Sequence, residues 1–209
     1  MSRPVNDESP FLDNDARAEL RARKRDAILE AAVRMFNERG YHATSLDDVA
    51  AQLGVSKPLV YHYLGTKEQV LLQCMQRGLA ELQAAFDVAQ AEPGTGLDRL
   101  RRYLVGYAEV NMSDFGRCVI RTGDEVLSPE NRALFRADKR KIDGHFRVLL
   151  AKAMEDGSAA VADVRFATFA IAGALNWPAR WHKQDGAQSM REIAEELTRF
   201  LIDGLRPRE

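Results

Sequence analysis

The chain has 209 residues, of which 45% are hydrophobic and 29% are charged, and its formal net charge is -1. These proportions are typical of an ordinary soluble protein, and the length allows one large helical domain or a small domain fused to a medium one. A net charge near zero argues against a generally basic nucleic-acid coat, so any contact with nucleic acid has to come from a local surface.

The two ends and the rare residue types exclude several classes of protein. Residues 1–16 mix Pro, Asp, Glu, Asn and Ser without an apolar block of signal-peptide length, which predicts a disordered tail on a cytoplasmic protein. The most apolar window, 166–179, is too short to cross a bilayer, so no membrane partner is expected. Cys74 and Cys118 are far apart and the four histidines lack ligand-like spacing, which predicts free buried thiols and no metal or other cofactor.

Apolar residues recur at three- and four-residue spacing along almost the whole chain, and no stretch alternates for long enough to make a convincing sheet. The sequence therefore predicts an all-α protein. A first helix is expected over about 17–39, ended by Gly40 in a left-handed turn. Ser45 is expected to cap a short second helix, which Gly54 stops.

A third short helix follows directly after this glycine turn. Ser56 is expected to cap it, Pro58 lies in its first turn, and it extends to about Tyr63. Thr66 and Gln69 form a predicted capping box that opens a long fourth helix. Later helices are expected at about 97–112, 117–126, 129–155, 162–183 and 189–204.

The second and third predicted helices have the length and the glycine turn of a helix-turn-helix, which presents its second helix to the DNA major groove. Val60 and Leu64 are four residues apart and are expected to face the core. The opposite face carries side chains that can meet phosphates or base edges, namely Lys57, Tyr61, His62 and the edge of Tyr63. On this geometry alone, DNA binding and an ordinary pair of core helices remain alternatives.

The local charge gives modest support to DNA binding. Residues 16–67 carry nine Lys or Arg against six Asp or Glu. Five of these cations lie within residues 17–25, at the beginning of the first helix, where they could flank a duplex and reach its backbone.

A set of ordered positions then carries a resemblance to a known family. They are Arg25-Asp26-Ala27-Ile28-Leu29-Glu30-Ala31-Ala32, Phe36, Gly40-Tyr41, Thr44-Ser45, Asp48-Val49-Ala50, Gly54-Val55-Ser56, Tyr61-His62-Tyr63-Leu64 and Lys67-Glu68. Over about 21–72 the chain resembles the amino-terminal domain of the TetR family of bacterial transcriptional repressors. By this resemblance, the positions expected to touch DNA are Thr44, Ser45, Lys57, Leu59, Tyr61, His62, Tyr63 and Lys67.

Two positions depart from the pattern of the family. Leu59 occupies a position where a threonine that contacts DNA is frequent, which affects the details of base reading. Leu64 replaces the usual phenylalanine at the end of the recognition helix, and this is a conservative change in the core.

The resemblance implies two domains, a helix-turn-helix DNA-binding domain over 17–66 and a larger helical ligand-binding and dimerisation domain over 67–209. The residues of the last two long helices independently favour a homodimer through those helices, since each carries an apolar stripe. The stripes are Phe166, Ala170, Gly173, Trp177 and Trp181, followed by Ile193, Leu197, Phe200, Leu201 and Leu205. Pro178 is expected to kink the first of these helices.

Aromatic and flexible side chains of the middle helices, together with the Asn-Trp pair of the penultimate helix, are the candidates for a pocket. The candidate ligand-binding residues are Phe86, Tyr103, Tyr107, Met112, Phe115, Phe135, Phe146, Phe169, Asn176 and Trp177. A chamber of this composition suits an apolar molecule oriented by a few polar groups. The alternative is that most of these side chains are ordinary core.

The segment 173–177, with Arg180-Trp181 and Asp185-Gly186, is similar to family members that sense fatty acyl-CoA or related thioesters. Several cations could bind the phosphates of such a ligand, or could simply belong to solvated helix faces. They are Arg101, Arg102, Arg117, Arg121, Arg136, Lys139, Arg140 and Lys141.

The sequence thus predicts a ligand-responsive transcriptional regulator, a repressor, that binds a palindromic double-stranded operator as a dimer. Its effector is expected to be a small apolar molecule or an acyl-CoA. The alternative is a helical lipid or CoA carrier without a DNA function. An enzyme is not expected, because we find no phosphate-binding glycine loop, nucleophile elbow or metal-ligand spacing.

Overall fold

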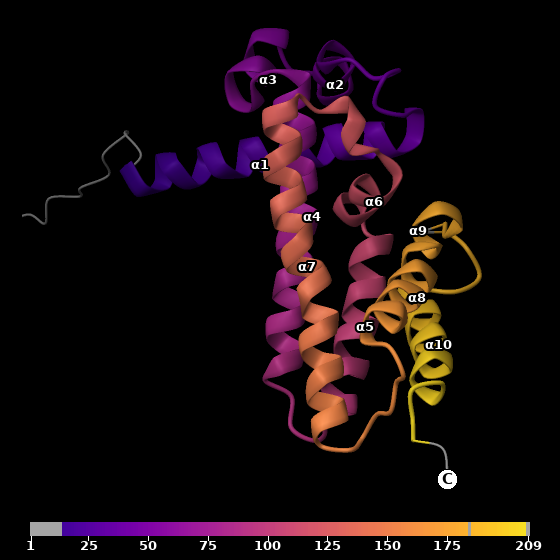
Figure 1. Cartoon of the computed structure of the whole chain (residues 1–209). Helices are drawn as coiled ribbons and strands as arrows, with labels where there is room; N and C mark the ends of the chain where they lie inside the picture. Colours follow the sequence, from indigo (N-terminus) through magenta and orange to yellow (C-terminus); the bar gives the residue numbers. More distant parts are fainter. Residues whose placement is uncertain (1–13, 184, 208–209) are drawn as a thin grey trace, which may run out of the picture.

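The computed structural model describes residues 14–183 and 185–207, and within these residues the chain forms helices and no strand, as the sequence predicted (Figure 1). The elements in chain order are α1 (Asn14–Arg39), α2 (Leu46–Leu53), α3 (Lys57–Leu64), α4 (Lys67–Gln90), α5 (Gly96–Met112), α6 (Asp114–Arg121), the 3₁₀ turn η1 (Asp124–Val126), α7 (Pro129–Glu155), α8 (Val164–Asn176), α9 (Pro178–Trp181) and α10 (Met190–Asp203). Most of the predicted tail, residues 1–13, lies outside the described residues, whereas residues 14–16 belong to α1.

The caps of α2 and α4 form where the sequence predicted them, whereas Ser56 occupies the cap position of α3 without a side-chain hydrogen bond to it. Ser45 Oγ accepts a hydrogen bond from the Asp48 amide, and the Asp48 carboxylate accepts one from the Ser45 amide, which completes a capping box at α2. Thr66 and Gln69 make the same box at α4. Gly40 and Gly54 end α1 and α2 at φ angles of 86° and 64°, in the left-handed region that glycine enters without a steric cost.

Two predicted helices are divided in the structure. The helix expected at 117–126 is instead α6 followed by η1, because Ser113 accepts a hydrogen bond from the Gly116 amide and starts α6 three residues early. The helix expected at 162–183 is divided into α8 and α9 at Pro178. Trp177 keeps helical angles, and the hydrogen-bond pattern is interrupted because Pro178 has no amide hydrogen to donate.

The long helices α4, α5 and α7 run side by side and form the body of the molecule, while α1 crosses one end of α4 beneath α2 and α3 (Figure 1). α8 and α10 pack against α5 on the other side of the body. The buried side chains form one core that continues from Val60 in α3 to Leu175 in α8. Cys74 and Cys118 are both buried in this core and are free thiols.

The described residues show neither a helix that is long and apolar enough for a transmembrane span nor a group of His, Cys, Asp and Glu side chains arranged to hold a metal ion.

Candidate DNA-binding surface and effector chamber

The two faces of α3 differ in exposure as their sequence predicts. Val60 and Leu64 are buried against the helices below, with 0% and 2% of their surface exposed. Tyr61 on the opposite face is 49% exposed, and Lys57 and His62 are exposed as well. A tyrosine normally buries much of its ring, so a half-exposed one between polar neighbours leaves a surface able to contact a partner.

Lys57 already has an anionic partner in this surface. Its Nζ lies 2.5 Å from Asp47 Oδ2 in α2, and this hydrogen bond raises the pKa of the lysine. Because both groups are exposed, the pair contributes little to stability. A phosphate that approaches α3 can therefore replace Asp47 as the partner of the ammonium group.

The structure places Thr44 differently from the other expected DNA contacts. Its side chain is 1% exposed, and its hydroxyl lies 2.9 Å from the carbonyl oxygen of Gly40 and 3.2 Å from that of Met35. The hydroxyl thus satisfies the carbonyls at the end of α1 and fixes the turn before α2. Its side chain does not face the solvent.

The remaining expected contacts surround the exposed face of α3 to different degrees. Ser45 is exposed, and its hydroxyl caps the start of α2. Leu59 and Tyr63 are half-buried. Lys67 Nζ lies 4.3 Å from the centroid of the Tyr41 ring and 3.4 Å from the carbonyl oxygen of His42. This partial burial lowers the pKa of Lys67. The exposed side chains of α3 among the expected contacts are therefore Lys57, Tyr61 and His62.

Four of the ligand-binding candidates form one packed cluster between α4, α5 and α7. Phe146 is completely buried, and its ring centroid lies 5.1 Å from that of Tyr103 and 4.8 Å from that of Tyr107. Phe86 stacks on His145 at 3.8 Å, and the His145 Nδ1 atom lies 3.2 Å from the Tyr103 hydroxyl. These side chains fill the space between the helices with one another.

His145 was missed by sequence reasoning, although a signal for it exists. It lies three residues after Ile142 and four before Leu149, on the buried stripe of α7. Burial lowers the pKa of His145, with Asp87 acting weakly in the opposite direction. The neutral imidazole is therefore the form that suits the folded protein.

A polar group lies at the α8 side of the aromatic cluster. The Tyr107 hydroxyl donates to Asn176 Oδ1 at 2.9 Å, and Asn111 Nδ2 donates to the same oxygen at 2.8 Å. Asn111 is completely buried, and its Oδ1 atom has no partner among the described residues. Burial raises the pKa of Tyr107 to about 12, so the phenol stays neutral and can donate. This group offers both a donor and an unused acceptor.

The other five ligand-binding candidates lie apart from the Asn111 group or serve as core. Met112 and Phe135 are buried, and Phe115 is half-buried beneath the Arg77 guanidinium. Phe169 in α8 and Trp177 directly after α8 are 60% and 63% exposed, so in the protomer they lie outside the packed cluster that contains Phe86. They lie there because the buried stripe of α8 consists of Thr168, Ile171 and Leu175.

The outer face of α8, α9 and α10 carries the largest exposed aromatic side chains of the described chain. They are Phe166, Phe169, Trp177, Trp181 and Phe200. Phe166 is 75% and Phe200 is 80% exposed. The stripe predicted on the last helix is divided, since Ile193 and Leu205 are buried within the protomer. We call these five side chains the outer aromatic face. Such a grouping is typical of an interaction surface.

A polar connection joins the start of α4 to the start of α7. Glu68 Oε1 accepts hydrogen bonds at 2.7 Å from the Ser128 amide and from Asn131 Nδ2. These bonds lower the pKa of Glu68. Since α4 begins directly after α3, the carboxylate connects the end of the molecule that carries α2 and α3 to α7, the helix that carries Phe146 and His145.

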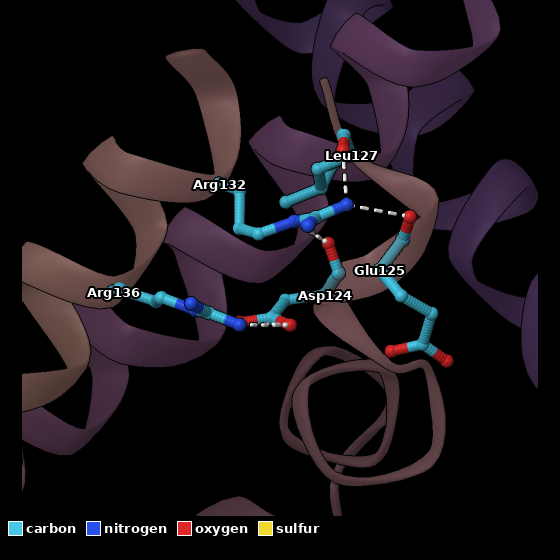
Figure 2. A network of polar contacts seen from close by, with 5 residues as sticks. All are labelled: Asp124, Glu125, Leu127, Arg132 and Arg136. Atoms are coloured by element: carbon cyan, nitrogen blue, oxygen red, sulfur yellow. Dashed lines mark hydrogen bonds and ion pairs between the residues drawn. The ribbon is translucent and has the colours of Figure 1, made fainter. Parts of the chain in front are cut away.

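Arginines of α7 fix the segment that precedes this connection (Figure 2). Arg132 donates to the carbonyl oxygens of Asp124, Glu125 and Leu127 at 2.8 to 3.0 Å. Arg136 pairs with the Asp124 carboxylate at 2.6 Å. The turn η1 is thereby held against the first two turns of α7, so this turn and α7 are expected to move together.

An open cleft of about 570 Å³ lies between α1, α6 and α9. Its charged lining consists of five cations and three carboxylates, with His182 beside them. They are Arg34, Arg117, Arg121, Arg180 and Lys183, and Glu38, Asp114 and Asp185. Arg117 donates to His182 Nδ1 at 2.8 Å and to the His182 carbonyl oxygen at 3.0 Å. Two of the cations named from the sequence, Arg117 and Arg121, therefore meet here, whereas Arg136 belongs to the α7 network.

Comparison with known proteins identifies the class to which this fold and surface belong. Residues 28–74 match the family model of bacterial regulatory proteins of the tetR family, and residues 93–205 match that of the tetracyclin repressor-like C-terminal domain. The second match spans more than half of the chain. The protein belongs to the TetR family and is a helix-turn-helix transcriptional regulator rather than an enzyme.

Three relatives illustrate the range of the similarity. The TetR family transcriptional regulator PfmR from Thermus thermophilus is 33% identical, with a TM-score of 0.77 over 86% of this chain and 99% of PfmR. AibR, solved in complex with isovaleryl coenzyme A and operator DNA, is 26% identical, with a TM-score of 0.74 over 85% of this chain and 97% of AibR. The HTH-type transcriptional activator FasR of Mycolicibacterium smegmatis is 30% identical over 111 residues. These residues are 53% of this chain and 51% of FasR.

Proposed function

We propose that this protein is a ligand-responsive repressor that binds a palindromic operator as a homodimer. The observation that carries the proposal is the exposed face of α3, where Tyr61, His62 and Lys57 are left outside the core while Val60 and Leu64 are buried. Ammonium, imidazole and phenol groups on one short helix suit both phosphates and base edges. In this proposal the DNA-binding domain is 17–66, the ligand-binding and dimerisation domain is 67–209, and the protein acts in the cytoplasm.

The surrounding residues of the recognition helix have different roles in this proposal. Ser45 and Tyr63 contact the DNA backbone from the rim, and Leu59 offers an apolar contact where the family often has threonine. Lys67 provides charge at the start of α4, near the free amides of that helix. Thr44 acts through the turn that it fixes, and the backbone of that turn is the part that meets the duplex.

The outer aromatic face is the proposed dimer surface. Its members lie on α8, α9 and α10, the elements that the sequence indicated for dimerisation, and exposed rings of this size are costly in a lone protomer. Two protomers joined there present two copies of α3 to one duplex. Successive major grooves on one side of B-DNA are about 34–36 Å apart, so the operator half-sites are expected at that spacing.

A footprinting experiment tests the operator proposal. The full chain is used to select duplexes from a random library, and the bound duplex is then cleaved with hydroxyl radicals. Two protected regions about one helical turn apart are expected. A helical carrier without a DNA function would enrich no duplex, and a single protected region would contradict binding as a dimer.

The proposed effector is an apolar molecule, with a short- or medium-chain acyl-CoA as the first candidate class. The cluster of Phe86, Tyr103, Tyr107 and Phe146 supplies an apolar lining, and the Asn111 carbonyl oxygen supplies an unused acceptor. The similarity to AibR, whose structure contains isovaleryl coenzyme A, supports this class. The basic cleft between α1, α6 and α9 is suited to the phosphates of such a ligand.

The packed state of this cluster suggests how an effector would act. Tyr103 and Phe146 have no exposed surface, so an acyl group can enter only if these rings separate. Movement of α7 would displace the Ser128 and Asn131 donors from Glu68 and so alter the position of α4. An effector that binds the separated arrangement more tightly would shift the population away from the DNA-competent one.

Calorimetry with a panel of acyl-CoAs tests the effector class, and a gel shift at saturating ligand then tests release from the operator. Binding of at least one thioester at micromolar concentration, with loss of the shifted band, is expected. Absence of binding at high micromolar concentration would remove acyl-CoA from the proposal. Strengthened operator binding would contradict release, and turnover of the thioester would contradict a regulatory site.

A further inference from the structure

The first half of α1 projects from the molecule as a free arm (Figure 1). Residues 17–27 are all exposed, and the buried residues of this helix begin at Ile28. The match to the amino-terminal family model also begins at residue 28. We call residues 14–27 the arm. At 1.5 Å per residue it extends about 20 Å.

The composition of the arm favours a stiff helix although nothing packs around it. Its interior contains Ala, Leu, Arg, Lys and Glu, which are good helix formers, and neither Gly nor Pro. Arg23 and Glu19 pair at 2.7 Å across one turn. The packed half of α1 continues the same helix and serves as its nucleus. The arm is therefore held in the direction that the packed half of α1 sets.

Charge is segregated around the arm except at Arg23, which lies beside the carboxylates and pairs with Glu19. At 100° per residue, Arg17, Arg21, Lys24 and Arg25 lie within an arc of about 100°, whereas Asp15, Glu19 and Asp26 lie within an arc of about 40° on the other side. Within the described residues, Arg17, Arg21 and Lys24 take part in no ion pair. The first group forms a continuous cationic stripe, although the net charge of the whole chain is only -1.

Two contacts show the direction that each stripe faces. Arg25 donates to Gln73 Oε1 in α4, and Gln73 in turn donates to the carbonyl oxygen of Leu64 at the end of α3. The cationic stripe therefore lies on the side of the recognition helix. Asn37 lies on the same side of α1 as the carboxylates, and it donates to the carbonyl oxygen of Asp114 in α6. The side of α1 that carries the acidic stripe therefore passes α6.

The arm also points away from α8, α9 and α10, the elements that carry the outer aromatic face, which lie on the other side of the body (Figure 1). In a dimer joined through that face, each arm would extend outward from the partner, below the duplex that continues past each half-site. We propose that the cationic stripe of the arm binds phosphates of this flanking duplex, without reading sequence. The inference rests on the proposed DNA-binding function and adds a second contact region to it.

Paired duplexes test the arm separately from the recognition helix. One duplex contains the selected operator alone, and the other adds about 10 base pairs on each side, which exceeds the reach of the arm at 3.4 Å per base pair. The variant carries Arg17→Gln, Arg21→Gln and Lys24→Gln, since glutamine keeps helix propensity and removes charge. The matched control carries Arg101→Gln, Arg140→Gln and Arg147→Gln, three exposed cations of the body.

Fluorescence anisotropy at several salt concentrations gives the comparison. The unchanged protein and the control are expected to bind the long duplex about tenfold or more tightly than the short one at 0.15 M salt. The arm variant is expected to bind the two duplexes alike, with a salt slope reduced by about 0.9 for each phosphate that the arm no longer neutralises. Circular dichroism of the variant checks that α1 stays helical.

Three results would overturn parts of this account in distinguishable ways. An arm variant that keeps the advantage of the long duplex contradicts the arm contact. Equal loss in the control and in the arm variant shows a general charge effect and also contradicts it. Failure of the unchanged protein to bind either duplex contradicts the proposed DNA-binding function itself.

Discussion

The exposed face of α3 and the aromatic cluster of the body use similar side chains for opposite purposes. Tyr61 is 49% exposed and makes no contact that the fold requires, whereas Tyr103 is completely enclosed between Phe86, Phe146 and His145. A large side chain is thus exposed at the first site, and several are buried at the second. In the segment α1–α3, which we call the head, a binding surface is therefore recognised by large side chains that stay outside the core. In the body it is recognised by buried polar groups that lack a hydrogen-bond partner.

The largest expected effect is on the free energy of unfolding and comes from the buried aromatic cluster. Phe146→Ala removes a ring that contacts Tyr103 and Tyr107, so the free energy of unfolding is expected to fall by about 3–5 kcal/mol. Denaturant unfolding followed by circular dichroism measures this change. Tyr61→Ala is the matched control and should change the free energy of unfolding by about 0.5 kcal/mol or less. An equal loss of unfolding free energy in the two variants would contradict the distinction between a buried cluster and an exposed face of α3.

The second effect is on dimer dissociation and concerns the outer aromatic face, which is predicted to become buried in the dimer. Trp177→Ser with Phe200→Ser removes two members of the outer aromatic face. Since central aromatic anchors are each worth about 2 kcal/mol or more, the loss of two should raise the dimer dissociation constant about 700-fold or more in sedimentation equilibrium. Val88→Ser, which changes an exposed apolar residue of α4, should leave it unchanged. A similar shift in both variants would place the interface elsewhere.

A third effect uses the pH dependence of the enclosed cluster. The pKa of His145 in the folded protein is below its ordinary value, so the unfolded chain binds a proton first as the pH falls. The melting temperature is therefore expected to decrease between pH 7 and pH 5. His145→Phe keeps a ring stacked on Phe86 and should reduce this pH dependence, although His182, whose pKa is also lowered, retains a part of it. An unchanged slope in the variant would show that His145 does not titrate in this range.

The smallest effect is on the melting temperature and tests the hydrogen bonds by which Glu68 connects α4 to α7. Glu68→Gln removes a charge that accepts hydrogen bonds from Ser128 and Asn131, so the melting temperature should be slightly lower at pH 7. Because the pKa of Glu68 is lowered by folding, this difference should vanish as the pH falls through the folded pKa. Glu130→Gln in the first turn of α7 is the control, and a pH-dependent difference of the same size there would remove the special role of Glu68.

Much of the head could be predicted from the sequence because its signals are local. Ser45, Gly54 and Thr66 are caps and stops whose effect depends on neighbours within four residues, and all three act in the structure as predicted. Thr44 was the exception. Its hydroxyl is used by carbonyls at the end of α1, and a short polar residue in a turn gives no local sign of whether its side chain points outward.

The body was less predictable because its signals depend on other helices. Phe169 and Trp177 belong to an apolar stripe, and periodicity does not show whether such a stripe faces the protomer core or another chain. Asn111 and His145 gain their importance from partners 65 and 42 residues away in the chain, respectively. Pairings of that kind are set by packing between helices, so spacing along one helix does not predict them.

The measurement that tests the central claim most directly is operator affinity for a protein with Tyr61→Ala and His62→Ala, compared with its unfolding curve. Because both side chains lie outside the core, the account predicts an unfolding midpoint within error of the unchanged protein and a dissociation constant for the operator at least about tenfold higher. An unchanged dissociation constant for a folded, dimeric double variant would contradict the claim that this face of α3 reads the DNA.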